Sequence, residues 1–395
     1  MSQSRRMAWI AIAVVVALSI SLLTVWQFTK NATADGHGHS ATKPSASSRP
    51  VPKAENAKPL RAGEKRLTLQ LPATYTPEAP DGVGTDDYRC FLLDPKLTKR
   101  TDLTGYDVLP DNPDVVHHVI LFKVAPADVA AAKSWDARTP GQGWTCFGDA
   151  GVPGNRNLDD APWLGAWAPG GTERVFGKNL SMPLAKGSQI IMQMHYNLLK
   201  GASADQSAIA LRVRKPSPKS QALHMVLLPA PVEMPCRAGK DDGPLCEREA
   251  AMEDVRQRFG DAASIGDALH LLCGKSEPGV VQSCIRNINR PMTVRAVAGH
   301  MHLLGREITI TLIPADGGAP RTLLHIGTWN FDEQEAQTVK PVQLKPFDKV
   351  KVTCRHAQWP RDGLPAFSQQ REDRYVVWGE GSTDEMCLGL LSVTD

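Results

Sequence analysis

The sequence contains no Cys-x-x-Cys motif, although it has eight cysteines. Zinc ribbons and thioredoxin-type redox sites depend on that spacing, so neither is available to this chain. Beyond the extreme N-terminus there is also no long basic block, and the formal net charge is only +3, so we expect no nucleic acid partner. An even number of cysteines without these motifs favours structural disulfides, which form in an oxidising compartment.

Glycine and proline are abundant by contrast: the chain has 32 and 30 of them, and they separate short runs rich in valine, isoleucine, leucine and threonine. This pattern indicates strands joined by turns, so the predicted fold class is mainly β. At 395 residues, 42% of them hydrophobic, the chain is long enough for two domains with cores of their own.

An apolar segment near the N-terminus predicts a membrane anchor. Arg5 and Arg6 precede an uncharged run from Ala8 to Phe28, and about 20 residues is the length at which a helix crosses the hydrocarbon layer. The basic residues make 1–29 a cytoplasmic stub and transmembrane anchor, with the rest in the periplasm, the cell exterior or a secretory lumen. A cleaved signal peptide is the alternative, because Ala32-Thr33-Ala34 resembles a cleavage site, but the apolar core is long for one.

Composition divides the remaining chain into a linker and two domains. Residues 30–62 are mostly alanine, serine, proline, lysine and glycine, which predicts a flexible linker. Between 63 and 215, short apolar segments alternate with turn signals, which indicates an antiparallel β-sandwich. The paired prolines of residues 215–219 indicate a link to a second, β-patterned domain, 220–395.

The second domain is interrupted at 235–285 by the periodicity of two short helices. Their apolar faces are Met252, Val255 and Phe259 in one, and Ile265, Ala268, Leu269 and Leu272 in the other. The cysteines that bracket these helices are Cys236, Cys246, Cys273 and Cys284. Three pairings are possible, and a disulfide-stapled antiparallel hairpin favours the nested pairs Cys246–Cys273 and Cys236–Cys284.

The other four cysteines divide between the two domains. Cys90 and Cys146 are the only ones in the first domain, so we expect them to pair. Cys354 and Cys387 then remain. A bridge between them would fix the strand that carries Met386 against its neighbour.

Two adjacent histidines, His117 and His118, interrupt the strand-like run from Asp114 to Phe122. Neighbouring strand residues point to opposite faces, so both can reach one metal ion only if the strand bends or bulges there. Otherwise one of them is a satisfied core residue. In a later strand Gln193 and His195 share one face, and His195 can complete a set of three imidazoles.

His300 and His302 lie two residues apart in another strand-like run, so they emerge on one face and can bind one ion. Two imidazoles suit zinc, copper, iron or nickel about equally. Met386 is the candidate third ligand, because a thioether favours copper, especially Cu(I), over zinc. The alternative is that both histidines are hydrogen-bonded strand residues and Met386 belongs to the core.

These features form an ordered series along the chain. Its members are His117-His118, Gln193-x-His195, His300-x-His302 followed by Leu303-Leu304-Gly305-Arg306, and Asp384-Glu385-Met386-Cys387. The series resembles the copper type II, ascorbate-dependent monooxygenases, the family of peptidylglycine α-hydroxylating monooxygenase and dopamine β-monooxygenase. The resemblance covers the chain from about residue 85 to about residue 391.

The resemblance implies two jelly-roll-like β-sandwich domains, each with one copper ion, facing each other across a solvent-filled cleft. The implied reaction is hydroxylation of a C–H bond with O2 and a one-electron reductant such as ascorbate. The implied ligands are His117, His118 and His195 for an electron-storing copper and the catalytic residues His300, His302 and Met386 for an oxygen-binding copper. The family's disulfides place partners at Cys90–Cys146 and Cys354–Cys387. Gln193 is predicted to order water or substrate in the cleft.

The chain departs from the family's pattern around the substrate. Where the peptide-hydroxylating member has an arginine for the substrate carboxylate, this chain has Ala298, and where it has substrate-contacting Asn and Tyr, this chain has Leu388 and Leu390. We therefore expect a small, neutral or largely apolar substrate. Arg295 or Arg306 would have to swing into the cleft to replace the missing cation; Arg295 has the wrong strand parity, and Arg306 follows a glycine turn.

Two other functions fit the same residues. A copper-binding or electron-transfer protein of the same fold would keep both ligand sets without hydroxylase activity. A zinc hydrolase would use His300 and His302 with Glu385 or Glu307 as base, although Met386 argues against it. The helical insertion is absent from the animal enzymes of the family, so its role is open.

Overall fold

The computed structural model describes residues 49–395 with the exceptions of 55, 81–83, 153–156 and 261–263. The expected transmembrane segment and most of the expected linker lie outside these residues. Within the described part of the chain, no helix has the length and apolar character needed to cross a membrane. The described residues belong to one compact unit, which is mainly β and contains several antiparallel sheets.

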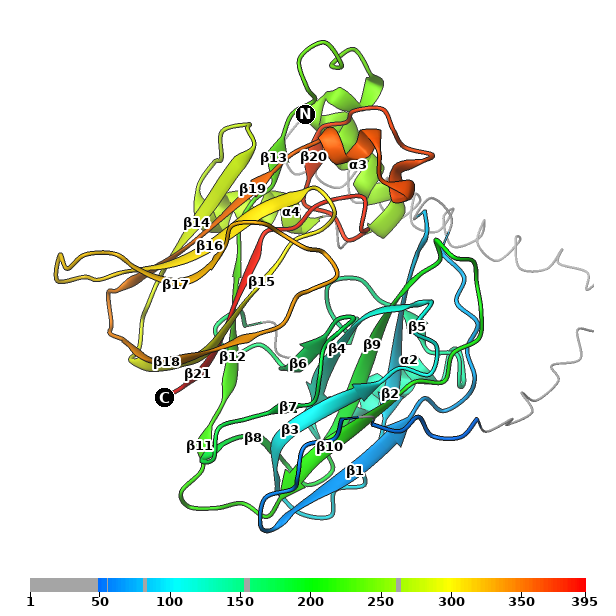
Figure 1. The fold of residues 1–395 in the computed structure, drawn as a ribbon, viewed down its shortest axis with the longest axis vertical. Coiled ribbons are helices and arrows are strands. Elements are labelled where there is room, and N and C mark those ends of the chain that lie inside the picture. The colour runs from blue at the N-terminus through cyan, green and yellow to red at the C-terminus, as the bar shows by residue number, and fades with distance from the viewer. Residues whose placement is uncertain (1–48, 55, 81–83, 153–156, 261–263) are drawn as a thin grey trace, which may run out of the picture. The chain divides into compact units, whose positions relative to one another are not determined.

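The first half of the described chain forms two sheets that we call the first sheet pair (Figure 1). Its elements are β1 (Glu64–Gln70), β2 (Asp86–Leu93), β3 (Thr101–Leu109), β4 (Val116–Val124), α2 (Val129–Asp136), β5 (Trp144–Thr145), β6 (Trp163–Trp167), β7 (Arg174–Val175), β8 (Leu180–Leu184), β9 (Gln189–Asn197), β10 (Ala208–Arg214) and β11 (Gln221–Ala222). One sheet has the order β1-β10-β3-β8-β11, with β7 beside β3, and the other has the order β5-β2-β9-β4-β6. The sheets face each other, because Tyr106 in β3 donates its hydroxyl to the carbonyl of Ala166 in β6 at 2.9 Å.

The second half forms another two sheets, the second sheet pair (Figure 1). Its strands are β12 (His224–Pro229), β14 (Val281–Asn287), β15 (Met292–His300), β16 (Gly305–Ile313), β17 (Arg321–Ile326), β18 (Gln337–Leu344), β19 (Lys349–His356) and β21 (Leu388–Thr394). The orders are β12-β21-β15-β18 and β14-β19-β16-β17. Shorter elements complete this half: β13 (Glu233–Met234) paired with β20 (Val376–Val377), and the 3-10 turns η1 (Pro244–Cys246), η3 (Trp359–Asp362) and η4 (Pro365–Phe367).

Two glycines let the sheets of the second pair approach closely beside His300. Gly299 in β15 and Gly389 in β21 are cross-strand partners. A Cβ on Gly299 would lie 2.8 Å from a side-chain carbon of Ile308 in the facing sheet, and one on Gly389 would lie 3.0 Å from Ile310. A larger residue would therefore push the strand that carries His300 away from the facing sheet.

The boundary between the two halves lies a few residues later than predicted. β11 follows the proline-containing link, yet it pairs with β8 of the first sheet pair. The second sheet pair therefore begins with β12 at His224.

The described end of the expected linker is bound to the first sheet pair, which differs from the prediction of a flexible tether. Arg212 in β10 is buried and donates to the carbonyls of Lys58 and Pro59 at 3.0 and 2.8 Å. The same guanidinium pairs with Glu64 and Glu173. A buried arginine needs several acceptors, and the linker backbone supplies two of them.

The predicted helical insertion is present as α3 (Arg248–Phe259) and α4 (Ser264–Cys273), which lie between β13 and β14. Met252, Val255 and Phe259 are buried on one face of α3, as expected. The predicted nested disulfides are wrong. The bridges are Cys236–Cys246 and Cys273–Cys284, and they close loops with sequence separations of only 10 and 11 residues. Neither bridge joins α3 to α4; Cys273 at the end of α4 is instead bonded to Cys284 in β14.

The other two predicted disulfides, Cys90–Cys146 and Cys354–Cys387, are present. Cys354 lies in β19 and Cys387 directly precedes β21, which belong to opposite sheets of the second pair. The bridge therefore joins the two sheets, and the expectation that it would join neighbouring strands is wrong. It still fixes the segment that carries Met386.

Candidate metal centre

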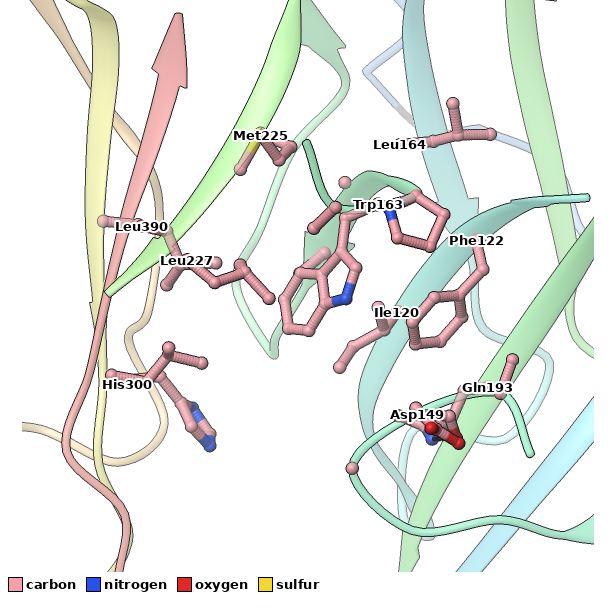
Figure 2. A pocket seen from close by; sticks show the side chains of 18 of the residues that line it. Ile120, Phe122, Asp149, Trp163, Leu164, Gln193, Met225, Leu227, His300 and Leu390 are labelled. Carbon is pink, nitrogen blue, oxygen red and sulfur yellow. Dashed lines mark hydrogen bonds between the residues drawn. The ribbon is translucent and has the colours of Figure 1, made fainter. Parts of the chain in front are cut away.

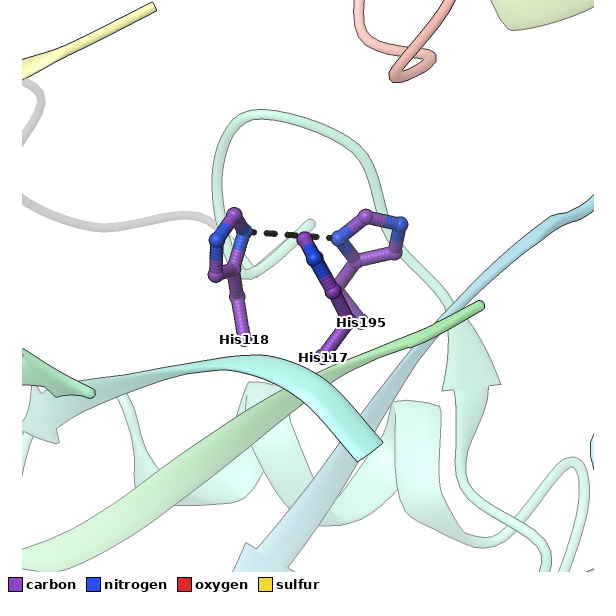
Figure 3. Close-up of side chains that lie close together, drawn as sticks. All are labelled: His117, His118 and His195. Carbon is purple, nitrogen blue, oxygen red and sulfur yellow. Dashed lines mark hydrogen bonds between the residues drawn. The ribbon is translucent and has the colours of Figure 1, made fainter. Parts of the chain in front are cut away.

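The paired histidines of β4 reach the same place because the strand has a bulge. The register between β4 and β9 shifts between Val116 and His118, so His117 is the extra residue that turns its side chain toward its neighbour. His118 lies opposite His195 of β9. The ligand nitrogens of His117, His118 and His195 all lie within 4.8 Å of one another (Figure 3). An ion about 2 Å from each nitrogen would hold its ligands about 3–4 Å apart, so this set, the first ligand set, fits one metal ion.

Carboxylates bind the outer nitrogens of this set. His195 Nε2 lies 2.8 Å from Asp86 Oδ1, and His117 Nε2 lies 3.1 Å from Asp332 Oδ1. Burial alone would raise the pKa of Asp86, but the hydrogen bonds from His195 and Ser382 lower it. Such partners fix the tautomer and leave the other nitrogen for a metal. The Nδ1 atom of His117 is buried and has no hydrogen-bond partner among the described residues.

His300, His302 and Met386, the second ligand set, are related by the register of β15 and β21. His300 pairs with Leu388, the second residue after Met386, and the ladder ends there, so that His302 lies in the turn after β15 and Met386 in the segment before β21. The rings of His300 and His302 are 5.1 Å apart, centroid to centroid. All three residues line one cavity.

A buried carboxylate fixes the backbones that carry this set. Glu385 Oε2 accepts from the backbone N–H groups of His302 and Met386 at 3.2 and 3.1 Å, and Oε1 accepts from Leu304 at 2.7 Å. His356 Nε2 lies 3.3 Å from the same carboxylate. One fully buried side chain therefore connects the turn after β15 with the segment before β21.

The two ligand sets lie beside each other, and Gln334 connects them. Its amide nitrogen lies 3.1 Å from His118 Nε2, and its amide oxygen lies 2.6 Å from His300 Nδ1. The rings of His118 and His300 are 5.9 Å apart. Phe331, on the same loop between β17 and β18, packs against His117, His118 and His302.

The pKa values of four of these imidazoles, His118, His195, His300 and His302, are lowered, which favours the neutral form that binds metal ions. Burial, with smaller contributions from neighbouring histidines, lowers the pKa of His118 well below its usual value, and burial also lowers the pKa of His195 and His302. For His300, burial and the neighbouring His302 lower the pKa to about 3.

His118 and His195 of the first ligand set and all three residues of the second line a cavity of about 830 Å³. Figure 2 shows part of this cavity, with His300 at its edge. The strand faces that carry the ligands also form its walls, since His118, Ile120 and Phe122 alternate along β4, and Ala298 and His300 along β15. Ala298 pairs with Leu390 across the strands. Ala298, Leu388 and Leu390, the apolar residues at which this chain departs from the peptide-hydroxylating enzyme, all line this cavity.

The other predicted residues are placed as follows. Gln193 lines the cavity, and its amide donates to the carbonyl of Asp149 at 3.3 Å. Arg295 donates to Thr394 and Gln221. Arg306 donates to the carbonyl of Leu303, and neither arginine lines the cavity. Both arginines are therefore bonded outside the cavity, and neither replaces the missing cation.

Sequence reasoning missed four residues that support the ligands: Asp86, Phe331, Gln334 and His356. Asp86 stands in an acidic pair at the start of a strand, which is a weak signal. The loop that carries Phe331 and Gln334 has no periodicity, and its contacts reach across more than 200 residues. Only the folded chain brings these residues to the ligands.

No protein-family model matches this chain, and no curated protein sequence matches it. The similar solved structures include an allantoicase, with 13% identity, 68% of this chain and 74% of that chain covered, and a TM-score of 0.17. A fucolectin from striped bass (Morone saxatilis) serum has 8% identity, coverage of 79% and 84%, and a TM-score of 0.20. The VP2 subviral particle of infectious bursal disease virus has 10% identity, coverage of 87% and 75%, and a TM-score of 0.20. At these TM-scores the likenesses carry no argument about what this chain does.

Proposed function

We propose that this chain is a dicopper monooxygenase that hydroxylates a C–H bond of a small, neutral molecule with O2 and a one-electron reductant such as ascorbate. The observation that carries the proposal is that His300, His302 and Met386 line one largely apolar cavity together with His118 and His195, two members of a set of three imidazoles. Imidazole donors suit copper, and a thioether favours Cu(I) in particular. The sheet pairs would be the jelly-roll-like domains of this family, and four disulfides support an extracytoplasmic location.

The overall reaction consumes one O2, two electrons and two protons. It converts one C–H bond to C–OH and releases one water. Copper, when bound, would supply the one-electron redox steps and the activation of O2. His117, His118 and His195 would hold one ion, and His300, His302 and Met386 the other.

The chain's own residues would organise this chemistry. Asp86 and Asp332 orient the imidazoles of His195 and His117, and Glu385 fixes the backbone of His302 and Met386. Gln334 lies between the ligand sets, with its amide oxygen accepting from His300 Nδ1 and its amide nitrogen beside His118 Nε2. The apolar walls of the cavity would exclude water from the reacting bond.

Two observations argue against the zinc hydrolase. Glu385 is fully buried, and both of its oxygens accept backbone N–H groups, so it has no free oxygen with which to activate water. Glu307 does not line the cavity, and its carboxylate lies beside His325 and Arg355. Neither carboxylate is therefore available as a base at His300 and His302.

The copper-binding electron-transfer protein stays the second candidate, because the Gln334 connection between the ligand sets would serve it equally well. The ratio of O2 consumed to product formed distinguishes the two functions. A monooxygenase consumes O2 in proportion to hydroxylated product when ascorbate and a suitable neutral compound are supplied. Uptake of O2 without product would favour the electron-transfer protein.

Metal analysis is the first experiment for both candidates. The purified protein is equilibrated with equal concentrations of copper and zinc, passed through a desalting column and analysed for both metals. We expect two copper ions per chain. Retention of zinc at the second ligand set, or of a single copper ion, would overturn the proposal.

A further inference from the structure

Helix α4 of the insertion has an apolar stripe that forms part of the cavity wall. The stripe comprises Ile265, Ala268, Leu269 and Leu272, spaced i, i+3, i+4 and i+7, and all four line the cavity. Leu269 is buried, whereas Ala268 is exposed and Leu272 is 40% exposed. The neighbouring Leu271 is 90% exposed and does not line the cavity. The stripe therefore presents apolar surface to the cavity that the rest of the described chain leaves uncovered.

This wall lies close to the second ligand set. Cys273, the last residue of α4, lies with its Sγ 3.8 Å from the carbonyl oxygen of Pro229. Pro229 pairs with Leu388, and Leu388 pairs with His300. The stripe thus reaches the cavity beside the ligands at which the C–H bond would react.

Several contacts hold α4 in this position. The Cys273–Cys284 bridge fixes its C-terminal end to β14. His270 Nε2 lies 2.7 Å from a carboxylate oxygen of Glu233, and Arg248 on α3 pairs with that same carboxylate. The helix is therefore a fixed wall and needs no partner to stay in place.

The rest of the lining is also mostly apolar. Ile120, Phe122 and Trp163 contribute from the first sheet pair, and Leu227 and Leu390 from the second (Figure 2). The cations that line the cavity are Lys123 and Arg174, and Arg174 already donates to the carbonyl of Ala336. The acidic residues that line it are Asp128, Asp149, Asp160 and Glu380. Burial raises the pKa of Glu380 to about 8, so three aspartates face two cations near neutral pH, and the side chains of the metal-free cavity offer an anionic ligand no net attraction.

Cavity size and geometry limit the occupant further. A volume of about 830 Å³ lies within the range that encloses a drug-sized ligand. The wall from His118 to Phe122 covers five residues of β4, and the four steps between them span about 13 Å at the rise of a strand. A molecule with an extended apolar part can therefore lie along β4 with one end at His118, whose ring lies 5.9 Å from that of His300 in the second ligand set.

We propose that the helical insertion is a substrate-binding element: its α4 stripe packs against a neutral molecule with an aromatic or aliphatic part, and selects against anions. The inference rests on the proposed function only in that the bound molecule is called a substrate, because binding itself needs neither O2 nor a reductant. The insertion thereby takes over a wall of the site that faces the oxygen-binding ligands.

Equilibrium binding of a homologous series tests this. Ethylbenzene, butylbenzene and hexylbenzene, together with the anion 6-phenylhexanoate, are titrated into the full-length protein without O2 or reductant, and tryptophan fluorescence or calorimetry gives the Kd. We expect affinity to rise about fourfold per methylene, since each one leaves water on binding. The anion should bind at least tenfold more weakly than butylbenzene.

Two neighbouring leucines provide a matched pair of variants. Leu272→Lys sets an ammonium group in the wall and should weaken binding of every neutral member at least tenfold, whereas Leu271→Lys, on the exposed side of the same turn, should leave it unchanged. The inference would be overturned if both variants weakened binding equally, or if affinity did not depend on chain length. It would also be overturned if the wild type preferred the anion and Lys123→Met abolished that preference. Binding with this pattern but without hydroxylated product under ascorbate and O2 would overturn the proposed function and leave the binding element standing.

Discussion

Ser382 donates both its backbone N–H and its hydroxyl to the carboxylate of Asp86, at 2.7 to 2.9 Å, although 296 residues separate them. Asp86 lies in the first sheet pair and Ser382 precedes β21 in the second, and both are fully buried. Asp86 also binds His195. The orientation of this ligand of the first set therefore depends on where the second sheet pair places Ser382.

Replacing Asp86 should therefore weaken the first ligand set. Asp86→Ala leaves His195 Nε2 and Ser382 without an acceptor, and loss of such a carboxylate lowers metal affinity about 10- to 100-fold. Competition with a chelator for Cu(I) measures it. Asp87→Ala is the matched control, because Asp87 is equally buried but binds Tyr75 and the backbone of Glu78. Equal loss of copper affinity in both variants would contradict this role of Asp86.

Met386→Leu removes the thioether and keeps the volume. We expect this variant to lose hydroxylation while the first ligand set still binds copper, so metal analysis should find one tightly bound copper ion per chain. Met301→Leu, at a fully buried methionine between His300 and His302 in the sequence, should retain both ions and activity. Full activity of Met386→Leu would refute Met386 as a ligand.

Glu385→Gln should destabilise the protein as well as the second ligand set. Glutamine offers one acceptor oxygen in place of two and sets an NH2 group against buried N–H donors. We expect the free energy of unfolding to fall by about 1–3 kcal/mol, measured by urea denaturation of the metal-free protein. Glu307→Gln, at a side chain that is 36% exposed, should change it by less than about 0.5 kcal/mol.

The Cys354–Cys387 bridge should contribute more stability than the Cys236–Cys246 bridge. Their sequence separations are 33 and 10 residues, for which loop-closure entropy predicts about 3.7 and about 2.7 kcal/mol. Paired Cys→Ser variants of each bridge, unfolded in urea, test the order. Reducing agents should destabilise the wild type by the same route, and free thiols at Cys354 and Cys387 in protein from its native compartment would refute the bridge.

Glu380 should make stability fall as pH rises through neutrality. Burial, with the charges of Asp384 and Asp149, raises its pKa from 4.5 to about 8. Between these values the folded state holds a proton that the unfolded state has released, so this group lowers the free energy of unfolding by up to about 1.4 kcal/mol per pH unit. Glu380→Gln should flatten that slope in urea unfolding of the metal-free protein from pH 5 to 8. An unchanged slope would contradict the assignment.

Strand geometry made much of the site predictable. Two adjacent histidines can share an ion only at a bulge, and β4 has its register shift at His117. Gln193 and His195 are two residues apart on β9, so their side chains share one face of the strand, and both line the cavity. The pairing of Cys236, Cys246, Cys273 and Cys284 was not predictable, because two helices allow several compact arrangements. The loop contacts of Gln334 and the Asp86–Ser382 contact follow from no local pattern.

The disulfide connectivity has a consequence for biosynthesis. Every bridge joins a cysteine to the next one along the chain, from Cys90–Cys146 to Cys354–Cys387, and no cysteine is left free. During vectorial synthesis, each cysteine therefore meets its native partner before any competitor has emerged. A simple thiol oxidant acting in order of emergence selects the native set from the many pairings that eight cysteines allow, with no need for later thiol–disulfide exchange.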